Sequence, residues 1–385
     1  MGWIARFFRR TAALSRRSEQ LCCHSRRECP TRVQLLGMER PFQEVAPCPA
    51  PKKPHTPPRP TEVSRMNNIS ASMRRILMKP LGFSFRFMPK INQAVEQGLT
   101  VFVFHDVTDQ PSQFAEEYGI AVSTKTFLRQ IRWIQSNFNV IHPADILNDT
   151  NIPKHAAIIT FDDGFLGSFE NGLAILEKQG VPSVVFLNMQ AILEQKPILS
   201  AVACYLNRYV PEFADFAKSI ALFPPYHLTL TPAILAAFED QYGTIDHAPV
   251  LDYQGAFADL NVVRAWDGKE LVVFGNHLYD HWNAPALSPE ELEDQYKRNE
   301  SALSLLKNAK NLFAFTNGQP ETCFTERDVD LVKRCGAGKV FSSYKGVNRD
   351  PRKFLLGRLS LSERDTCENH FWFRLGRAVY SRQRT

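Results

Sequence analysis

The chain has 385 residues, of which 44% are hydrophobic and 22% charged, so it holds enough apolar residues for one large domain or two ordinary ones. Its formal net charge is +6, but residues 1–65 contain 13 Lys/Arg and 5 Asp/Glu, which leaves −2 for the rest. A near-neutral body lacks the basic face that nucleic-acid binding needs, and no window approaches the ~18 apolar residues of a membrane helix. We therefore expect no nucleic-acid partner and no integral membrane segment.

The N-terminal part is rich in proline and arginine. Its segment "PCPAPKKPHTPPRP" (47–60) cannot continue a helix or join a central strand. We expect residues 1–65 to be a disordered basic tail and 66–98 to be a lead-in to the folded body. No clear signal peptide is present, so the expected location is cytoplasmic by default, and the sequence specifies no oligomeric state.

From residue 99 the chain alternates short apolar runs with longer amphipathic segments. Such alternation predicts parallel βα units, and the simplest arrangement is a distorted (β/α) barrel of about seven to eight parallel strands. The block 190–269 interrupts this rhythm and reads as an insertion within the barrel of residues 99–385, with short helices and a loop that faces the substrate. The runs that we expect to form strands are 100–106, 139–143, 156–163, 183–189, 270–277, 311–318, 339–344 and 354–359.

Titratable side chains follow three of these runs. His105 and Asp106 end the first, Asp162 and Asp163 end the third, and His277 ends the fifth, with His281 four residues later. In βα barrels the reactive groups lie at the carboxyl ends of the strands, so we expect these residues to share one site.

Two interpretations remain open for each pair. On a helical turn His277 and His281 would face the same way and grip one cation, or they are two unrelated histidines. Asp162 and Asp163 either precede a helix N-terminus or turn together into the barrel mouth, since Gly164 permits a sharp turn. In the second case one carboxylate joins the histidines around a divalent metal, and the other accepts a proton from water.

The motifs "TFDDG" (160–164) and "GNHLYDHW" (275–282), with the segment "FAFTNGQPETCFTERDVDLVKRCGAGKVFSS", resemble the polysaccharide deacetylase (NodB-type) family. The resemblance extends from about residue 101 to 361, apart from much of the insertion. It implies a distorted βα barrel that removes N-acetyl or O-acetyl groups from sugars with a bound metal. It also implies that Asp162 is the general base and that Asp163, His277 and His281 bind zinc or a similar divalent ion.

The sequence departs from the family pattern at several positions. Leu278 stands where Ser or Thr is usual, and "FAFTNGQP" has Asn317 without the arginine that braces the base in many members. The late segment "LLGRLSLSERD" lacks the histidine that acts as general acid in many members, and His370, which lies beyond this segment, is a weak candidate for that role. In the branch of poly-N-acetylglucosamine deacetylases, a histidine ends an early strand, and "VFVFHDV" resembles that pattern with Phe104 in place of the usual tyrosine. The resemblance therefore makes His105 the candidate general acid, and the alternative is a core histidine bonded to the backbone.

Asn317 and Trp282 are expected to contact the substrate, although Trp282 could equally be a wall of the pocket. The main functional hypothesis is a metal-dependent deacetylase of an acetylated sugar or glycan. The alternatives are a catalytically silent barrel that binds carbohydrate or a partner, suggested by the missing arginine and histidine, and a hydrolase of the same fold that cleaves another carbon–nitrogen bond.

Overall fold

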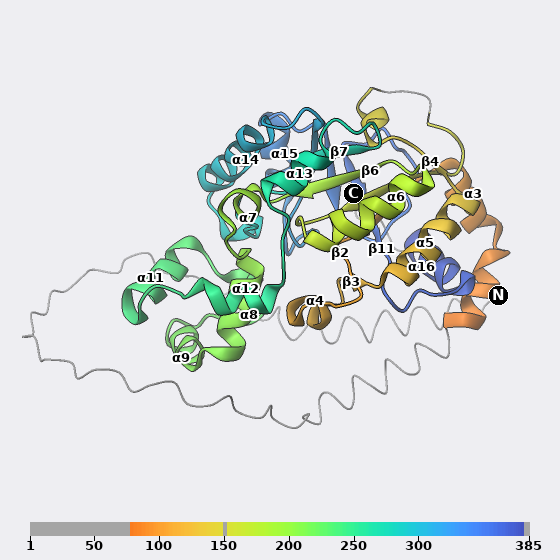
Figure 1. Cartoon of the computed structure of the whole chain (residues 1–385). Helices are drawn as coiled ribbons and strands as arrows, with labels where there is room; N and C mark the ends of the chain where they lie inside the picture. The colour runs from red at the N-terminus through yellow and green to blue at the C-terminus, as the bar shows by residue number, and fades with distance from the viewer. Residues whose placement is uncertain (1–77, 149–151, 381–385) are drawn as a thin grey trace, which may run out of the picture. The chain divides into compact units, whose positions relative to one another are not determined.

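The computed structural model describes residues 78–148 and 152–380, and the expected tail 1–65 lies outside them. Its centre is a 9-stranded sheet in which every strand pairing is parallel (Figure 1). The strands are β1 (Leu99–Phe104), β4 (Asn139–Val140), β5 (Ala156–Phe161), β6 (Ser183–Leu187), β7 (Val272–Asn276), β8 (Ala309–Ala314), β9 (Lys339–Ser342), β10 (Leu355–Gly357) and β11 (Leu359–Ser360). A separate parallel pair is formed by β2 (Asp106–Val107) and β3 (Ala121–Val122).

The sheet closes into a barrel through one short segment. Its strand order is β10-β9-β8-β7-β6-β5-β1-β11, with β4 beside β5. Because β10 and β11 are consecutive and separated only by Arg358, segment 355–360 pairs with β9 through its first half and with β1 through its second half. The expected distorted barrel is therefore confirmed.

Apolar residues from strands on all sides of the ring meet in one cluster. The cluster includes Val101, Ile158, Phe186 and Phe341, and all four residues are fully buried. Alternate residues of each strand thus fill the barrel interior, as the near-continuous apolar runs predict.

Helices cover the outside of the barrel. The expected cap of the segment that begins at Ser288 is present, because Ser288 and Glu291 form a capping box at the start of α14. No helix among the described residues is long and apolar enough to cross a membrane. The helices outside the insertion are one over residues 78–86, α3 (Pro89–Gln97), α4 (Gln113–Tyr118), α5 (Thr124–Asn137), η1 (Pro143–Leu147), η2 (Ser168–Leu173), α6 (Ala174–Gln179), η3 (Ala284–Ala286), α14 (Pro289–Leu303), α15 (Glu326–Arg334) and α16 (Glu368–Tyr380).

The chain between β6 and β7 is helical. It packs its own apolar cluster, which includes Phe213, Phe238 and Val250 and also takes in Phe114 of α4 and Trp282. Figure 1 shows α8, α9, α11 and α12 grouped beside α4. The helices of this insertion between β6 and β7 are α7 (Met189–Glu194), α8 (Leu199–Tyr209), α9 (Pro211–Ser219), α10 (Tyr226–Thr229), α11 (Pro232–Tyr242), α12 (His247–Gln254) and α13 (Leu260–Trp266).

Candidate active site

The two aspartates at the end of β5 point to different partners because the backbone turns between them. Asp162 continues the strand direction, and its N–H donates to the Phe104 carbonyl of β1 at 3.0 Å. Asp163 has φ 73° and Gly164 has φ 106°, so two successive residues lie in the left-handed region. Gly164 tolerates this conformation readily, as expected from the sequence, whereas Asp163 is held there by its surroundings.

Asp162 forms a buried ion pair with Arg358, the residue between β10 and β11. The two guanidinium nitrogens lie 2.6 and 2.7 Å from the two carboxylate oxygens, and the Arg358 side chain is fully buried. The same guanidinium donates to Thr160 Oγ1 and to the Ser342 carbonyl. Burial raises the pKa of Asp162, but Arg358 and the nearby histidines outweigh this effect and lower the net pKa. The carboxylate therefore stays ionised.

This ion pair corrects one expectation from the sequence. Asn317 indeed stands in the segment where a bracing arginine is usual, but the guanidinium is not missing, because Arg358 reaches Asp162 from another strand. Arg358 lies in "LLGRLS", the segment noted only for its lack of histidine. A lone arginine flanked by apolar residues on a predicted strand was the signal that could have revealed it, since a buried arginine needs an acidic partner.

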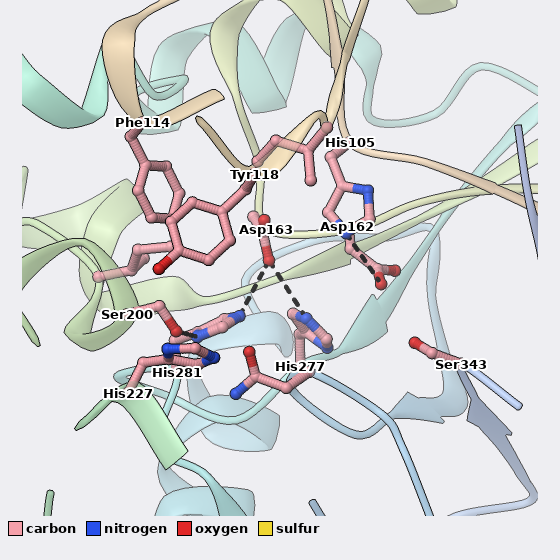
Figure 2. Close-up of a pocket in the computed structure, with 13 residues that line it drawn as sticks. His105, Phe114, Tyr118, Asp162, Asp163, Ser200, His227, His277, His281 and Ser343 are labelled. Atoms are coloured by element: carbon pink, nitrogen blue, oxygen red, sulfur yellow. Dashed lines mark hydrogen bonds and ion pairs between the residues drawn. The ribbon is translucent and has the colours of Figure 1, made fainter. Parts of the chain in front are cut away.

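Asp163, His277 and His281 converge, as predicted. Nε2 of His277 is 3.3 Å and Nε2 of His281 is 3.1 Å from Oδ1 of Asp163, and all three residues are buried (Figure 2). Burial raises the pKa of Asp163, but the two histidines outweigh it and hold the pKa well below its usual range. The carboxylate in this cluster is thus also ionised.

The histidines do not lie on a helical turn, so that part of the prediction is wrong. Residues 277–283 form a loop after β7, and His281 and Leu278 both have positive φ, 64° and 61°. Asn188 holds this loop by donating to the carbonyls of His277 and Leu278. The convergence thus comes from two left-handed residues and a buried amide, which the four-residue spacing alone does not specify.

The contacts on the other ring nitrogens leave the Nε2 atoms suited to a metal ion. Nδ1 of His277 lies 2.7 Å from the Ala314 carbonyl, which can only accept, so Nδ1 carries a proton and Nε2 is the nitrogen left to bind a metal ion when it is deprotonated. Nδ1 of His281 lies 3.0 Å from Ser200 Oγ. Burial lowers the pKa of His277, but the carboxylates of Asp162 and Asp163 outweigh this effect and raise the net pKa. A positive charge is therefore favoured between Nε2 of His277 and Oδ1 of Asp163, either as a proton on Nε2 or as a metal ion in its place. The residues present therefore fit a divalent metal.

Figure 2 shows His105 next to Asp162, with Asp163, His277 and His281 below and to the left of it. Its Nε2 is 3.9 Å from Oδ2 of Asp162, and its side chain is 25% exposed, so it is not a core histidine. Its carbonyl accepts a hydrogen bond from Ser168 Oγ, which fixes the strand end. Burial lowers the pKa of His105, and the charges of Asp163 and Asp162 oppose this effect without reversing it.

Of the other residues named from the sequence, Asn317 lines the pocket and Trp282 and His370 do not. Asn317 lines the pocket with a φ of 57°, and its Nδ2 is buried with no hydrogen-bond partner among the described residues. Trp282 does not line this pocket; it packs in the apolar cluster of the insertion, and its Nε1 lies 3.3 Å from Asp280 Oδ2. His370 lies on α16, where its Nδ1 contacts the Arg364 carbonyl, and it does not line the pocket either.

Several residues that line the pocket were missed from the sequence. The described lining residues contain no lysine or arginine. Phe114, Tyr118, Ser200 and His227 come from α4, α8 and α10. No motif marks them, because they are brought to the strand ends by packing of the insertion. The complete set is His105, Phe114, Tyr118, Ile120, Asp162, Asp163, Ile198, Ser200, His227, His277, His281, Asn317 and Ser343.

The chain matches no known family profile and no curated protein. Among solved structures it is similar to the Streptococcus pyogenes deacetylase PplD in complex with acetate, with 11% identity, a TM-score of 0.49, and coverage of 73% of this chain and 99% of that one. It is also similar to IcaB from Ammonifex degensii (18% identity, TM-score 0.47, coverage 72% and 97%) and to a de-N-acetylase from Aggregatibacter actinomycetemcomitans (15%, 0.46, 71% and 98%). At this level of similarity the function must be inferred from the chain's own side chains.

Proposed function

We propose that this chain is a metal-dependent hydrolase that removes acetyl groups from an N-acetylated or O-acetylated sugar. The observation that carries the proposal is the pair of adjacent carboxylates in one pocket, one held by Arg358 and the other facing two histidine Nε2 atoms. The sequence motifs around these residues resemble those of polysaccharide deacetylases. Two ionised carboxylates with different partners match a division into proton acceptor and metal ligand.

In this proposal Asp163, His277 and His281 hold the metal, with zinc as the first candidate because two imidazoles and one carboxylate leave open positions. When bound, the ion would supply Lewis-acid activation of water and of the acetyl carbonyl. Ala314 and Ser200 keep the two rings oriented for this task.

Asp162 is the general base of the proposed reaction. Arg358 occupies one side of each carboxylate oxygen, and each oxygen keeps a further lone pair with which to accept a proton from the attacking water. His105, with Nε2 at 3.9 Å from Oδ2 of Asp162, is placed to pass the proton that Asp162 takes from the attacking water to the leaving nitrogen or oxygen of the sugar. Arg358 also removes one reason for the silent-barrel hypothesis, since the bracing guanidinium is present.

The roles of the two aspartates give a direct test. Asp162→Asn is expected to keep stoichiometric metal and to lose turnover by about 10²-fold or more, because an amide cannot accept the proton. Asp163→Asn is expected to weaken metal binding first, because a neutral amide oxygen is a poorer ligand. Metal content is measured by elemental analysis, and turnover by acetate release from an N-acetylglucosamine oligosaccharide.

The matched control is Asp294→Asn on the exposed surface of α14, which should change neither quantity. If the unmutated chain releases acetate and both Asp162→Asn and Asp163→Asn retain metal and activity, the mechanism is wrong. If it releases nothing from the oligosaccharide but cleaves a formamide or a cyclic amide, the carbon–nitrogen hydrolase hypothesis replaces the deacetylase.

A further inference from the structure

Two side chains of the pocket wall, one on α4 and one on α10 of the insertion, take no part in the proposed chemistry. Tyr118 lies on α4 and His227 on α10, and Figure 2 shows both on the opposite side of Asp163 from His105. Both residues lie outside the motifs "TFDDG" and "GNHLYDHW". Their function must therefore be derived from their own contacts.

Tyr118 is held firmly yet remains exposed. Its ring packs against Phe114, with centroids 4.9 Å apart, and stands at 90° to the His227 ring at 5.7 Å. Its hydroxyl lies 2.6 Å from Cys204 Sγ of α8. Despite these contacts the residue is 44% exposed, which is high for an aromatic side chain that lines a pocket. The ring thus presents apolar surface to a ligand at little cost in side-chain entropy.

His227 offers polar atoms beside that ring. Neither ring nitrogen forms a hydrogen bond within the described part of the chain, and neither is buried without a partner. Its backbone is fixed, because the Leu228 carbonyl accepts a hydrogen bond from Nδ2 of Asn283 at 2.9 Å. Asn283 follows the ligand His281 by two residues, so the position of α10 is tied to the loop that carries the metal ligand.

A sugar ring has apolar C–H faces and polar hydroxyl edges, so an exposed aromatic ring beside a hydrogen-bonding group suits it. The absence of lysine and arginine from the described lining disfavours a sugar acid, whose carboxylate would need a cation. We propose that Tyr118 and His227 form a subsite for a neutral acetylated hexosamine unit. Tyr118 packs on the sugar face, and a His227 ring nitrogen bonds to a hydroxyl. This proposal rests on the proposed function, since the subsite serves the same pocket.

The test measures binding separately from turnover. An N-acetylglucosamine tetrasaccharide is titrated by calorimetry into the full chain carrying Asp162→Asn, which prevents hydrolysis. Adding Tyr118→Ala or His227→Ala should raise the Kd about tenfold or more, because each removes one contact with the sugar. Tyr118→Phe should leave the Kd within about twofold, because the ring is retained. The metal content of each variant is measured in parallel as a check that the site remains assembled.

Two substitutions in the same insertion serve as controls. His247→Ala on α12 and Tyr242→Ala on α11 remove the same residue types away from the pocket, and neither should change the Kd. The proposal is overturned if the tetrasaccharide fails to bind, or if Tyr118→Ala and His227→Ala bind it as tightly as their parent. Failure of the proposed function is seen elsewhere, as a lack of Asp162-dependent acetate release, and does not alter the binding comparison.

Discussion

Adjacent like charges at a strand end are stable here because each carboxylate meets its own counter-charge. Asp162 pairs with Arg358, and Asp163 faces His277 and His281. The left-handed backbone at Asp163 separates the two side chains, so neither carboxylate has to share a partner. One residue of backbone turn thus produces two carboxylates with distinct chemistry.

A third carboxylate in this region lacks such a partner. Asp106, next to His105, is 7% exposed, and its Oδ1 forms no hydrogen bond with any described residue. Burial raises the pKa of Asp106 to about 6, against a smaller lowering by the Val107 N–H. The ionised form is therefore unfavourable in the folded chain.

The cost of burying the ionised Asp106 carboxylate predicts that the effect of Asp106→Asn on stability depends on pH. The folded pKa of Asp106 lies above its ordinary value of 3.8, so the folded state binds the proton more tightly, and stability falls as pH rises from about 4 to about 6. Above that range the ionised carboxylate costs up to about 3 kcal/mol of unfolding free energy, which the amide avoids. Asp106→Asn should therefore stabilise the chain at pH 8 and not at pH 4.

Urea unfolding at both pH values measures the difference. The control is Asp252→Asn, at an exposed position of α12, which should leave the unfolding free energy unchanged at either pH. An equal effect of Asp106→Asn at pH 4 and pH 8 would show that the carboxylate is not the source of the instability.

At the scale of elements, the insertion supports the candidate metal site and is not merely an addition to the barrel. Ser200, on the first turn of α8, lies 3.0 Å from Nδ1 of His281 and is buried. The Leu199 N–H also donates to the Asp280 carbonyl at 3.4 Å, so α8 holds both the ring and the backbone of the ligand loop. Loss of the hydroxyl should free the His281 ring to rotate.

Ser200→Ala is accordingly expected to weaken metal affinity about 10-fold or more, since an oriented ligand no longer binds from a fixed position. Ser200→Thr keeps a hydroxyl and should lose less. Competition with a chromogenic chelator measures both affinities. Ser219→Ala on α9 removes a hydroxyl that bonds only to the Phe216 carbonyl and should have no effect. An unchanged metal affinity in Ser200→Ala would remove α8 from the site.

At the scale of the whole molecule, the sequence predicted the barrel and the convergence of Asp163, His277 and His281. The apolar runs coincide with β1, β5, β6 and β7 because these strands are buried along their whole length and must be apolar throughout. The strand-end rule then brought His105, Asp162, Asp163, His277 and His281 together correctly. Both signals are local, so a single sequence contains them.

What the sequence did not predict depends on contacts between distant segments. Ser200, Tyr118 and His227 reach the pocket only because the insertion packs on α4 and on the loop after β7. The partner of Arg358 could be identified only once segment 355–360 was placed beside β1, next to β5. Trp282 was expected as a substrate contact from its neighbour His281, yet its side chain turns into the apolar cluster.

Arg358 links closure of the barrel to the proposed general base, and this connection can be tested. Arg358→Met would leave Asp162 buried without its counter-charge, which is expected to cost about 3–5 kcal/mol of unfolding free energy. The same substitution should lower turnover by about 10²-fold, because the base loses its orientation, while metal content is retained. Arg358→Lys should be intermediate, since an ammonium group cannot form two parallel hydrogen bonds to the carboxylate.

The second step of this test removes both charges. Asp162→Asn added to Arg358→Met should recover part of the lost stability, because a neutral amide needs no counter-charge. Urea unfolding of the two single variants and the double variant measures the coupling free energy. Arg352→Met breaks an exposed ion pair with Asp350 and should cost less than about 1 kcal/mol. If Arg358→Met costs no more than this surface substitution, or if Asp162→Asn lowers its stability further, the buried pair does not stabilise the closed barrel.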